Sequence, residues 1–343
     1  MNASTQINSA LTTTILRETN RLAAIADEWD NLYQQSPRAI PFQRREWILA
    51  WIEAFAPRNL IVIQVHDEHD LVGLAPLLIY SRGPDHILAF AGGGVSDYLG
   101  LLAETGREQE VLKAILQCIN DIPDWNLLEL TDINRESSLL TSKKLKPYVQ
   151  EHNTCSVLPL PSTEAELLKI LSDKQRANLR NARSRLQRAG GAHVELARGD
   201  TLTEFLEDLF RLHTARWANR GGPGVLNDEN TRKFHRLCSP ELLAAGILRL
   251  YRLRVRETTV AVLYSLWGSE TVYCYLQGFE PEASFLSPGT YLMYEALKDA
   301  VHHGMRRFDF LRGQESYKQH WRAQPEFTHC VQLQRNELSI LAT

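Results

Sequence analysis

The 343-residue sequence lacks the marks of several protein classes, and each absence narrows its function. Five cysteines are scattered along the chain without any CxxC pair, at Cys118, Cys155, Cys238, Cys274 and Cys330. This spacing favours neither a disulfide framework nor a zinc site, so we expect no metal. No apolar run approaches the roughly 20 residues that span a bilayer. The first 20 residues have no basic start and no continuous apolar stretch, so we expect no signal peptide and a reduced, soluble, cytoplasmic protein.

An excess of charge of one sign is also missing. The chain has 38 Lys and Arg against 41 Asp and Glu, a formal net charge of −3. Because a dedicated nucleic-acid binder has a basic footprint, this balance argues against nucleic acid as the main partner, although it leaves room for a local basic patch. A chain of this length can bury a substantial core and is expected to form two domains.

Two segments of the sequence have the same predicted order: strand, strand, strand, glycine-bearing loop, helix, strand. In the first segment these are residues 60–65, 71–80, 86–91, 92–94, 108–119 and 127–130. In the second they are residues 247–255, 259–267, 271–279, a loop at 287–289, and then 290–302 and 307–311. The short turns allow hairpins, so each sheet should be mostly antiparallel. We therefore expect an α/β (α+β) fold with two similar domains.

Helices are expected before each set of strands, and a proline-containing segment between the two halves. The predicted helices are residues 22–34, 44–55, 165–189 and 203–217. The longest of them ends at Gly190-Gly191, which is typical of a helix C-terminus. Pro159 and Pro161 mark residues 150–163 as the junction. The expected domains are therefore residues 1–157 and 158–343.

The turn Ser287-Pro288-Gly289-Thr290 precedes the predicted helix 290–302. A helix that begins at such a turn offers unpaired backbone N–H groups and the positive end of its dipole to an anion. Gly289 allows the ligand to approach the backbone, and the Thr290 hydroxyl can donate a hydrogen bond. The alternative is an ordinary N-cap without a ligand. The turn alone favours the ordinary N-cap, and its position after a strand and before an amphipathic helix narrows the difference between the two interpretations.

A polar cluster follows the next strand, between Asp309 and Trp321. Arg312 and Lys318 are suited to binding phosphate or carboxylate. Glu315, Tyr317 or His320 can accept a proton. The alternative is an Asp309–Arg312 ion pair with Trp321 packed in the core. So many polar groups at one strand end favour a functional site.

Three further segments carry candidate substrate-binding residues. Residues 174–188 contain six cations and no acid, with Arg180 and Arg183 on one helical face. They fit a phosphorylated or acidic substrate or RNA, or else a solvated basic face. His213, Arg216 and Trp217 precede a glycine-rich loop, either as a substrate-facing lid or as an ordinary helix end. In the N-terminal half, Asp97 and Tyr98 follow three glycines, where a plain glycine turn is the alternative.

Several stretches together resemble the CelD-like branch of the GNAT acyltransferases, which is related to the Fem-type peptidyltransferases. They cover nearly the whole chain, and the last is the most specific: PFQRREWILAW, SDYLG, RANLRNARSRL, LHTARWANRGGPGVL, LSPGTYLMYEAL and FDFLRGQESYKQHW. The resemblance implies two tandem GNAT-like domains. It also implies transfer of an acyl group from a thioester such as acetyl-CoA to an amine or hydroxyl, in small-molecule, cell-envelope or exopolysaccharide chemistry.

The resemblance also implies roles for individual residues. The strand should diverge from its neighbour at Leu276-Gln277-Gly278, whose N–H groups would meet the thioester carbonyl. Ser287, Gly289 and Thr290 would hold the pyrophosphate of acyl-CoA. From the residue types themselves, we hypothesise a further set of site residues. Those expected to bind the acceptor are Arg180, Arg183, His213, Arg216, Trp217, Asp97, Tyr98, Arg312 and Trp321, and those expected to be catalytic are Glu315, Tyr317 and Lys318.

The sequence departs from the usual GNAT pyrophosphate pattern, Gln/Arg-x-x-Gly-x-Gly/Ala, because the turn at residues 287–290 has a single glycine. Two alternatives therefore stay open. Fem relatives use aminoacyl-tRNA as donor, although they have a helical arm that we do not find here. The second alternative is a catalytically silent GNAT-like protein that supports exopolysaccharide (cellulose) synthesis.

Overall fold

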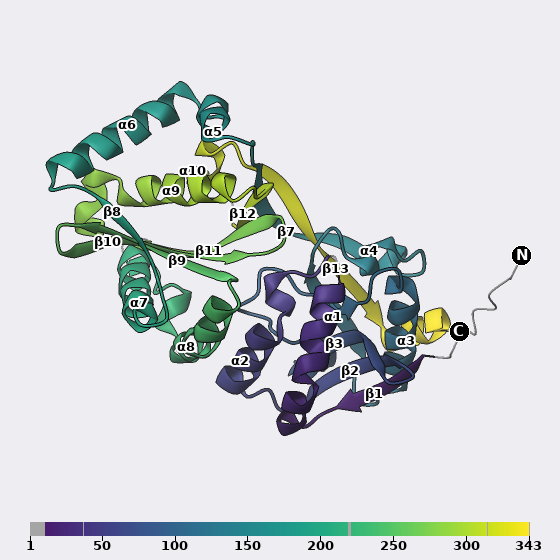
Figure 1. Cartoon of the computed structure of the whole chain (residues 1–343). Helices are drawn as coiled ribbons and strands as arrows, with labels where there is room; N and C mark the ends of the chain where they lie inside the picture. Colours follow the sequence, from purple (N-terminus) through teal and green to yellow (C-terminus); the bar gives the residue numbers. More distant parts are fainter. Residues whose placement is uncertain (1–10, 37, 219–220, 314, 343) are drawn as a thin grey trace, which may run out of the picture. The chain divides into compact units, whose positions relative to one another are not determined.

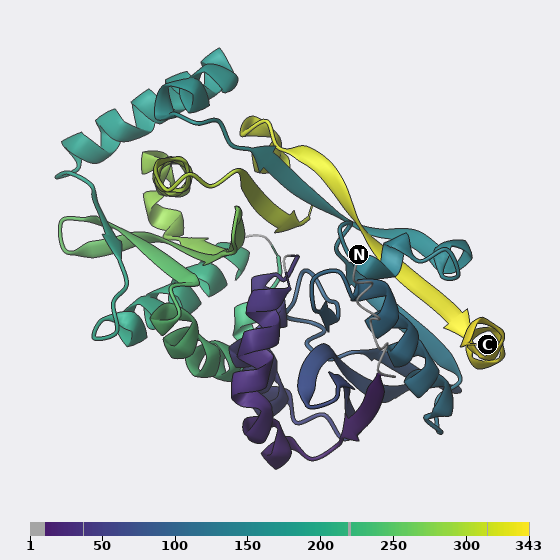
Figure 2. The same cartoon turned by 45° about the vertical axis from the view of Figure 1, so that its right-hand side comes forward.

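The computed structural model describes residues 11–36, 38–218, 221–313 and 315–342. Within them, the chain divides into two compact units. Unit 1 consists of the ranges Met1–Ile52, Ala56–Asn153 and Phe327–Thr343, and unit 2 of Glu53–Phe55 and Thr154–Glu326. Figures 1 and 2 show the chain from two directions.

Unit 1 is a sheet in the order β1-β2-β3-β4-β6-β13, with β5 paired to β3. Its strands are β1 (Thr12–Leu16), β2 (Leu60–Asp67), β3 (Asp70–Arg82), β4 (Asp85–Phe90), β5 (Leu102–Ala103), β6 (Leu127–Ile133) and β13 (Gln324–Gln334). Its helices are α1 (Ala26–Gln35), α2 (Arg45–Phe55), α3 (Glu108–Asp121), α4 (Ser138–Thr141) and α11 (Arg335–Ala342). The first six residues of β2 are buried because α1 and α3 cover opposite faces of the sheet (Figures 1 and 2).

The strands of unit 2 lie in the order β7-β12-β11-β10-β9-β8. Its strands are β7 (Val149–Pro159), β8 (His193–Leu196), β9 (Leu248–Val255), β10 (Thr258–Trp267), β11 (Thr271–Phe279) and β12 (Arg307–Arg312). Its helices are α5 (Glu164–Ile170), α6 (Asp173–Arg188), α7 (Leu202–Ala218), α8 (Glu229–Ala244), α9 (Pro288–His302) and α10 (Ser316–His320), with a short 3-10 helix, η5 (Pro281–Leu286), before α9. Helices α6 and α9 lie on one side of this sheet and α7 and α8 on the other (Figure 1).

The expected repeat of element order is confirmed. Unit 1 contains β2, β3, β4, α3 and β6, and unit 2 contains β9, β10, β11, α9 and β12 in the same sequence. The described strand pairs are antiparallel except β4 with β6 and β11 with β12. Each parallel pair is connected through a helix, as a parallel crossover requires. The fold is therefore mixed α/β, with a largely antiparallel sheet flanked by helices.

The structure differs from the expected elements at three places. The single helix predicted over residues 165–189 is two helices, because the extended Ser172 interrupts it and its Oγ accepts a hydrogen bond from the Gln175 N–H at 3.1 Å. The predicted junction at residues 150–163 mostly forms β7. Residues 327–343, which we expected in the C-terminal domain, are grouped with unit 1 because β13 pairs with β6 there.

Candidate functional site

In unit 1, the space beside the parallel strands β4 and β6 is occupied by the chain itself. The two strands pair at Ile87 and Leu88, and further along Leu99 takes a place beside Ile133. The Leu99 N–H donates to the Asp132 carbonyl at 2.9 Å. The divergence between these two strands is therefore filled.

Asp97 and Tyr98 belong to this filling segment. Tyr98 is buried, with its ring 6.2 Å from the Phe42 ring, and Asp97 is half-buried. The helix that follows, α3, has Glu108 and Glu110 in its first turn, and these carboxylates disfavour an anion at that helix end. Among the described residues of unit 1, the start of α3 is therefore poorly suited to hold a phosphate.

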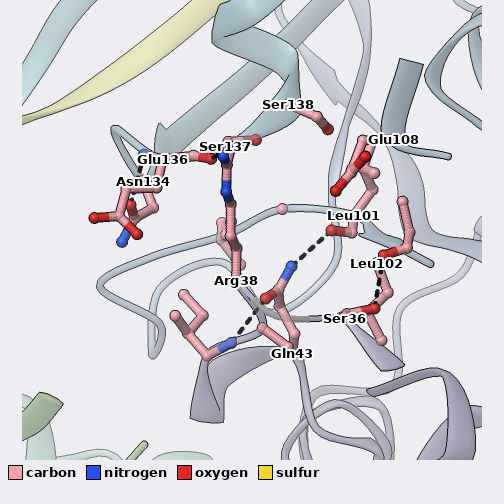
Figure 3. Close-up of a pocket in the computed structure, with 15 residues that line it drawn as sticks. Ser36, Arg38, Gln43, Leu101, Leu102, Glu108, Asn134, Glu136, Ser137 and Ser138 are labelled. Carbon is pink, nitrogen blue, oxygen red and sulfur yellow. Dashed lines mark hydrogen bonds between the residues drawn. The ribbon is translucent and has the colours of Figure 1, made fainter. Parts of the chain in front are cut away.

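A cavity of about 50 Å³ lies near this segment in unit 1 (Figure 3). Most of its polar groups are already paired. Arg38 donates to the Glu136 carbonyl at 2.8 Å, and Gln43 donates to the Leu101 carbonyl at 2.8 Å. A space of this size holds little more than a few water molecules, so it is too small for a nucleotide or a sugar.

In unit 2, the matching strands β11 and β12 diverge and stay open. Their parallel pairing runs only from Thr271 to Tyr273. Tyr275 is an extra residue in the pairing with β10, a β-bulge that bends β11 at this point. Leu276, Gln277 and Gly278 follow the bulge and pair with β10, while the ladder to β12 has already ended in the described chain. The divergence that the resemblance implied is thus present.

Helix α9 begins beside the divergent part of β11. Ser287 has left-handed backbone angles (φ 56°, ψ 47°), and its side chain does not cap the helix. Pro288 has no N–H, and the Tyr291 N–H donates back to the Ser287 carbonyl at 3.2 Å. In the described structure, the N–H groups of Gly289 and Thr290 have no hydrogen-bond partner. Two donors at the positive end of α9 are therefore available to an anion.

A cavity of about 240 Å³ lies where these features meet, formed entirely by unit 2. Seven of the predicted site residues line it. They are Arg216, Gln277, Ser287, Gly289, Thr290, Tyr317 and Trp321, and the remaining lining residues are Gln175, Phe279, Ser284, Pro288, Met293 and His320. The Arg216 guanidinium is buried, donates to the Gln277 carbonyl at 3.3 Å and lies 5.5 Å from the centre of the Phe279 ring. The cavity is therefore apolar on one wall and rich in hydrogen-bond donors on the other.

The Tyr317 hydroxyl is held against the divergent strand. It accepts a hydrogen bond from Gln277 Nε2 at 2.6 Å. Burial, and to a lesser degree the charge of Glu315, raise the pKa of Tyr317 far above its usual value. The phenol is consequently protonated at neutral pH. The protonated phenol can donate a hydrogen bond, whereas we had expected it to accept a proton.

Lys318 is turned away from the cavity and holds the backbone instead. Its buried Nζ donates to the carbonyls of Leu311 (3.0 Å), Arg312 (2.6 Å) and Gly313 (3.1 Å) and lies 2.9 Å from Glu315 Oε2. These contacts engage the ammonium completely. Glu315 and Arg312 do not line the cavity either. Lys318 therefore fixes the end of β12 and the start of α10, and so positions Tyr317 next to it.

Helix α7 packs directly on β11 at Gly278. A Cβ at this glycine would lie 2.4 Å from the backbone nitrogen of His213, so the close approach requires glycine. His213 is buried, its Nδ1 has no hydrogen-bond partner, and burial, with a lesser effect of Arg216, lowers its pKa to about 4. Trp217 packs 6.1 Å from the His213 ring. His213 and Trp217 thus stand behind the cavity wall, and α7 contributes Arg216 to the wall itself.

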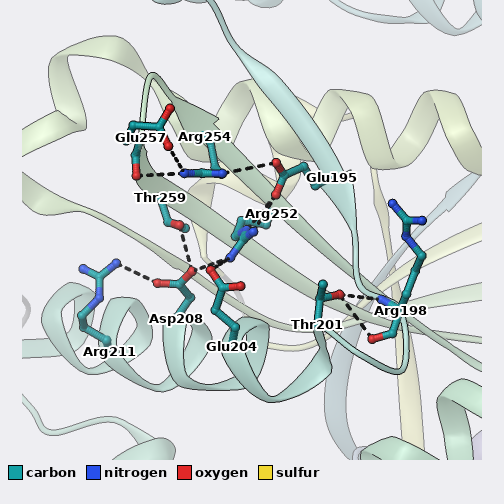
Figure 4. Close-up of polar contacts among 10 residues, drawn as sticks. All are labelled: Glu195, Arg198, Thr201, Glu204, Asp208, Arg211, Arg252, Arg254, Glu257 and Thr259. Carbon is teal, nitrogen blue, oxygen red and sulfur yellow. Dashed lines mark hydrogen bonds and ion pairs between the residues drawn. The ribbon is translucent and has the colours of Figure 1, made fainter.

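Helix α7 is fixed to the sheet by an ionic network around Arg252 of β9 (Figure 4). The buried Arg252 guanidinium donates to Glu195 at 2.7 Å, to Glu204 at 2.5 Å and to Asp208 at 3.3 Å. Glu204 and Asp208 belong to α7, so the network ties this helix to β8 and β9. Its rigidity helps to keep Arg216 in place, two turns further along α7.

Arg180 and Arg183 do not line the cavity. Both are exposed on α6, and neither has a hydrogen bond or ion pair among the described residues. Arg176 of the same helix is used structurally, because it donates to the carbonyls of Leu168 and Leu171 at the end of α5. Arg185 and Arg188 also donate to backbone carbonyls, those of Phe285 at 2.8 Å and Ser184 at 3.3 Å, so several cations of the predicted basic face are engaged within unit 2.

The main residue that we missed in the sequence is Gln175. It is 4% exposed and occupies the buried side of α6 together with Leu179, Ala182 and Leu186. Gln175 lines the cavity, and its Oε1 accepts a hydrogen bond from Asn178 Nδ2 at 3.4 Å. A glutamine within an apolar stripe was the available signal, because buried polar groups normally have a partner.

The described residues contain no cluster of three or more His, Cys, Asp or Glu side chains that could hold a metal ion. None of the described helices is long and apolar enough to cross a membrane.

Comparison with known proteins gives one family match. Residues 173–319 match the family model described as an acetyltransferase (GNAT) domain. The matched segment lies wholly inside unit 2 and contains all the residues that line the cavity except His320 and Trp321. This segment of unit 2 is therefore similar to a GNAT acetyltransferase domain. A search of curated protein sequences found no match.

Solved structures resemble the chain over nearly its whole length. A crystal structure of FemX has a TM-score of 0.66 at 12% identity, covering 96% of this chain and 100% of that one. A protein of unknown function from Bacteroides thetaiotaomicron VPI-5482 has a TM-score of 0.62 at 14% identity, with coverage of 94% and 99%. The C-terminal domain of a putative lysylphosphatidylglycerol synthetase from Agrobacterium fabrum has a TM-score of 0.56 at 10% identity, with coverage of 93% and 94%. At these identities the similarity concerns the fold alone.

Proposed function

We propose that the protein is a GNAT-type acyltransferase that moves an acyl group from acyl-CoA, acetyl-CoA in the simplest case, to an amine or hydroxyl. The observation that carries the proposal is the cavity between the start of α9 and the divergent end of β11. The N–H groups of Gly289 and Thr290, with Gln175 Nε2, would bind the diphosphate of the donor. The pantetheine arm would follow β11, and the backbone at residues 276–278 would meet the thioester carbonyl.

Transfer of this kind needs two bound reactants in line and no covalent enzyme intermediate. The acceptor attacks the thioester carbonyl, the carbon–sulfur bond breaks, and the leaving thiolate takes a proton from the Tyr317 hydroxyl. His320 lines the cavity and is exposed, so it is the lining residue suited to removing the proton of the acceptor. Glu315 is paired with Lys318 and would act only through the position of α10.

Binding of the donor is the direct test. Titration calorimetry with acetyl-CoA should give one site for each chain, since the corresponding place in unit 1 is filled. Gly289→Asp should weaken binding about tenfold or more, because the carboxylate would meet the phosphates. A Cβ at Gly289 meets nothing closer than 3.5 Å, so the variant should fold. Gly199→Asp is the matched control, since nothing lies within 4 Å of that position. Equal binding by both variants would refute the proposed cradle.

Tyr317→Phe should reduce turnover about 100-fold, the usual contribution of a positioned proton donor, while acetyl-CoA binding changes less than about threefold. Steady-state rates with a panel of amines and amino sugars measure this. Tyr294→Phe is the control. Its hydroxyl also donates a hydrogen bond, to Glu164 at 2.7 Å, but it lies outside the cavity. A Tyr317→Phe variant with the turnover rate of the unmodified enzyme would contradict the proposed role of Tyr317 as proton donor.

The acceptor class that we propose is a saccharide or peptide precursor of the cell envelope or of an exopolysaccharide, which rests on the CelD-like resemblance of FDFLRGQESYKQHW. A second candidate donor is an aminoacyl-tRNA, favoured by the exposed cations of α6. RNA that copurifies with the protein and competes with acetyl-CoA would support it. A chain that binds neither donor would instead fit a silent partner of a polysaccharide synthase.

A further inference from the structure

A hydrogen-bonded pair of side chains, Gln277 and Tyr317, lies in the wall of the unit 2 cavity. The two residues come from different elements, β11 and α10, and are joined by the 2.6 Å bond from Gln277 Nε2 to the Tyr317 hydroxyl oxygen. An amide nitrogen only donates, so the phenolic oxygen accepts and its own hydrogen points away from the amide. The pair therefore limits the directions in which Tyr317 can donate.

The course of β11 determines which way the Gln277 side chain faces. Successive side chains of a strand point to opposite faces of the sheet. Gly278 faces α7, since a Cβ there would lie 2.4 Å from the backbone nitrogen of His213. Gln277 consequently faces the side of the sheet that α6 and α9 cover, where the cavity lies (Figure 1).

The Tyr317 ring is held by contacts that do not involve its hydroxyl. It lies 6.4 Å from the Phe310 ring at an interplanar angle of 78°, and the Arg216 guanidinium carbon lies 5.9 Å from its centre. Lys318, the next residue, is fixed to three backbone carbonyls. The position of the ring is thus determined without Gln277, and the effect of the amide falls on the hydroxyl.

The environment of the pair also acts on the charge of the phenol. Burial raises the pKa of Tyr317, whereas the charge of Arg216 and, to a lesser degree, the Gln277 hydrogen bond oppose this rise. A hydrogen bond becomes stronger as its acceptor oxygen gains negative charge. The Gln277 amide therefore stabilises the phenolate more than it stabilises the phenol.

We propose that Gln277 is a positioning residue for acyl transfer, whose side-chain amide directs the Tyr317 proton toward the leaving sulfur and stabilises the phenolate that results. This role rests on the proposed function and belongs to the side chain, apart from the backbone at residues 276–278. The carbon–sulfur bond breaks, the sulfur takes the Tyr317 proton, and the phenolic oxygen keeps the electron pair. Solvent then reprotonates the phenolate, and the acceptor releases one proton for each thiol formed.

Steady-state kinetics of Gln277→Met and Gln277→Glu test the role. Methionine has a similar volume but donates no hydrogen bond, so kcat should fall about tenfold while the KM for acetyl-CoA changes less than about threefold. A glutamate carboxylate only accepts, so it would draw the Tyr317 hydrogen to itself and should lower kcat at least as far. Gln187→Met is the matched control, since Gln187 is exposed on α6, and it should keep the full rate.

A double-mutant cycle separates this role from a merely structural one. In a Tyr317→Phe background, Gln277→Met should change kcat by less than about twofold, because no hydroxyl is left for the amide to direct. NMR of protein isotopically labelled at tyrosine Cζ gives a readout that does not depend on turnover. The Tyr317 signal, identified by its absence in Tyr317→Phe, should shift in Gln277→Met and stay in place in Gln187→Met.

The outcomes separate this inference from the function on which it rests. Full turnover by Gln277→Met, equal losses from this change in both backgrounds, or an unmoved Tyr317 signal overturns the role of Gln277 while acyl transfer stands. A Gln277→Met protein that keeps its kcat but has a raised KM would make Gln277 a donor-binding residue and also overturn the inference. An unmodified protein that binds no acetyl-CoA and transfers no acyl group overturns the proposed function itself.

Discussion

Lys318→Met is expected to lower the free energy of unfolding by about 3–5 kcal/mol, because it removes a buried charge whose partners stay behind. Three consecutive carbonyls, those of Leu311, Arg312 and Gly313, point at the Lys318 ammonium, and Glu315 lies beside it. Methionine fills the volume of the lysine stem but donates no hydrogen bond. The carbonyls and the Glu315 carboxylate would then lose their principal partner in a site with little access to water.

Urea denaturation followed by circular dichroism measures this effect. Lys174→Met serves as the matched control, since Lys174 is exposed and has no partner among the described residues, and its stability should stay within about 0.5 kcal/mol of the unmodified protein. A Lys318→Met protein of unchanged stability with no activity would instead make Lys318 a catalytic residue, as its sequence context had suggested. Loss of stability together with loss of activity supports the positioning role.

Acidification from pH 7 to pH 5 is expected to destabilise the native state by about 4 kcal/mol through two histidines. Burial, and to a lesser degree Arg216, lower the pKa of His213 to about 4. Burial, with a lesser effect of His213, lowers the pKa of His235 to about 3, and the His235 ring is surrounded by Phe234, Tyr264 and Tyr275. In the unfolded chain both bind a proton near pH 6.5.

The direction of this pH effect follows from the number of protons bound in the native and unfolded states. Below about pH 6.5 both histidines bind a proton in the unfolded chain, whereas in the native state they stay neutral down to about pH 4. The free energy of unfolding therefore decreases as the pH is lowered through this range. At pH 5 each histidine contributes about 2 kcal/mol of the loss. His213→Gln should halve the difference between urea midpoints at pH 7 and pH 5, whereas His193→Gln, an exposed histidine, should leave it unchanged. Parallel pH dependence of all three proteins would contradict the prediction.

Local sequence patterns were sufficient to predict most of the strands and helix α9, whose start lies at the cavity. The hairpins of unit 2 follow from short polar turns such as Arg256-Glu257 between two apolar runs, and α9 follows from a proline and a glycine ahead of an amphipathic stretch. The elements that were missed depend on distant partners. β13 owes its pairing to β6, nearly 200 residues earlier, and α8 keeps an internal Pro240 that would argue against a helix on propensity alone.

The sequence predicted which residues form the candidate site better than it predicted the roles of those residues. Seven predicted residues line one cavity because the turn at residues 287–290 and the bulge of β11 bring two distant segments together. Lys318 is different. A lysine that satisfies backbone carbonyls has the same sequence signature as a lysine that binds phosphate, and only its burial separates the two. Gln175 was overlooked because it stands among exposed cations.

The strand β13 has a consequence for synthesis on the ribosome. Residues 329–334 pair with β6 of unit 1, but they follow every residue of unit 2 in the chain. When residue 153 leaves the exit tunnel, the N-terminal sheet still has an unpaired edge beside β6, and about 175 further residues must be translated before its partner emerges. Open strand edges promote aggregation, so a nascent chain that stalls within unit 2 should need chaperones to stay unaggregated.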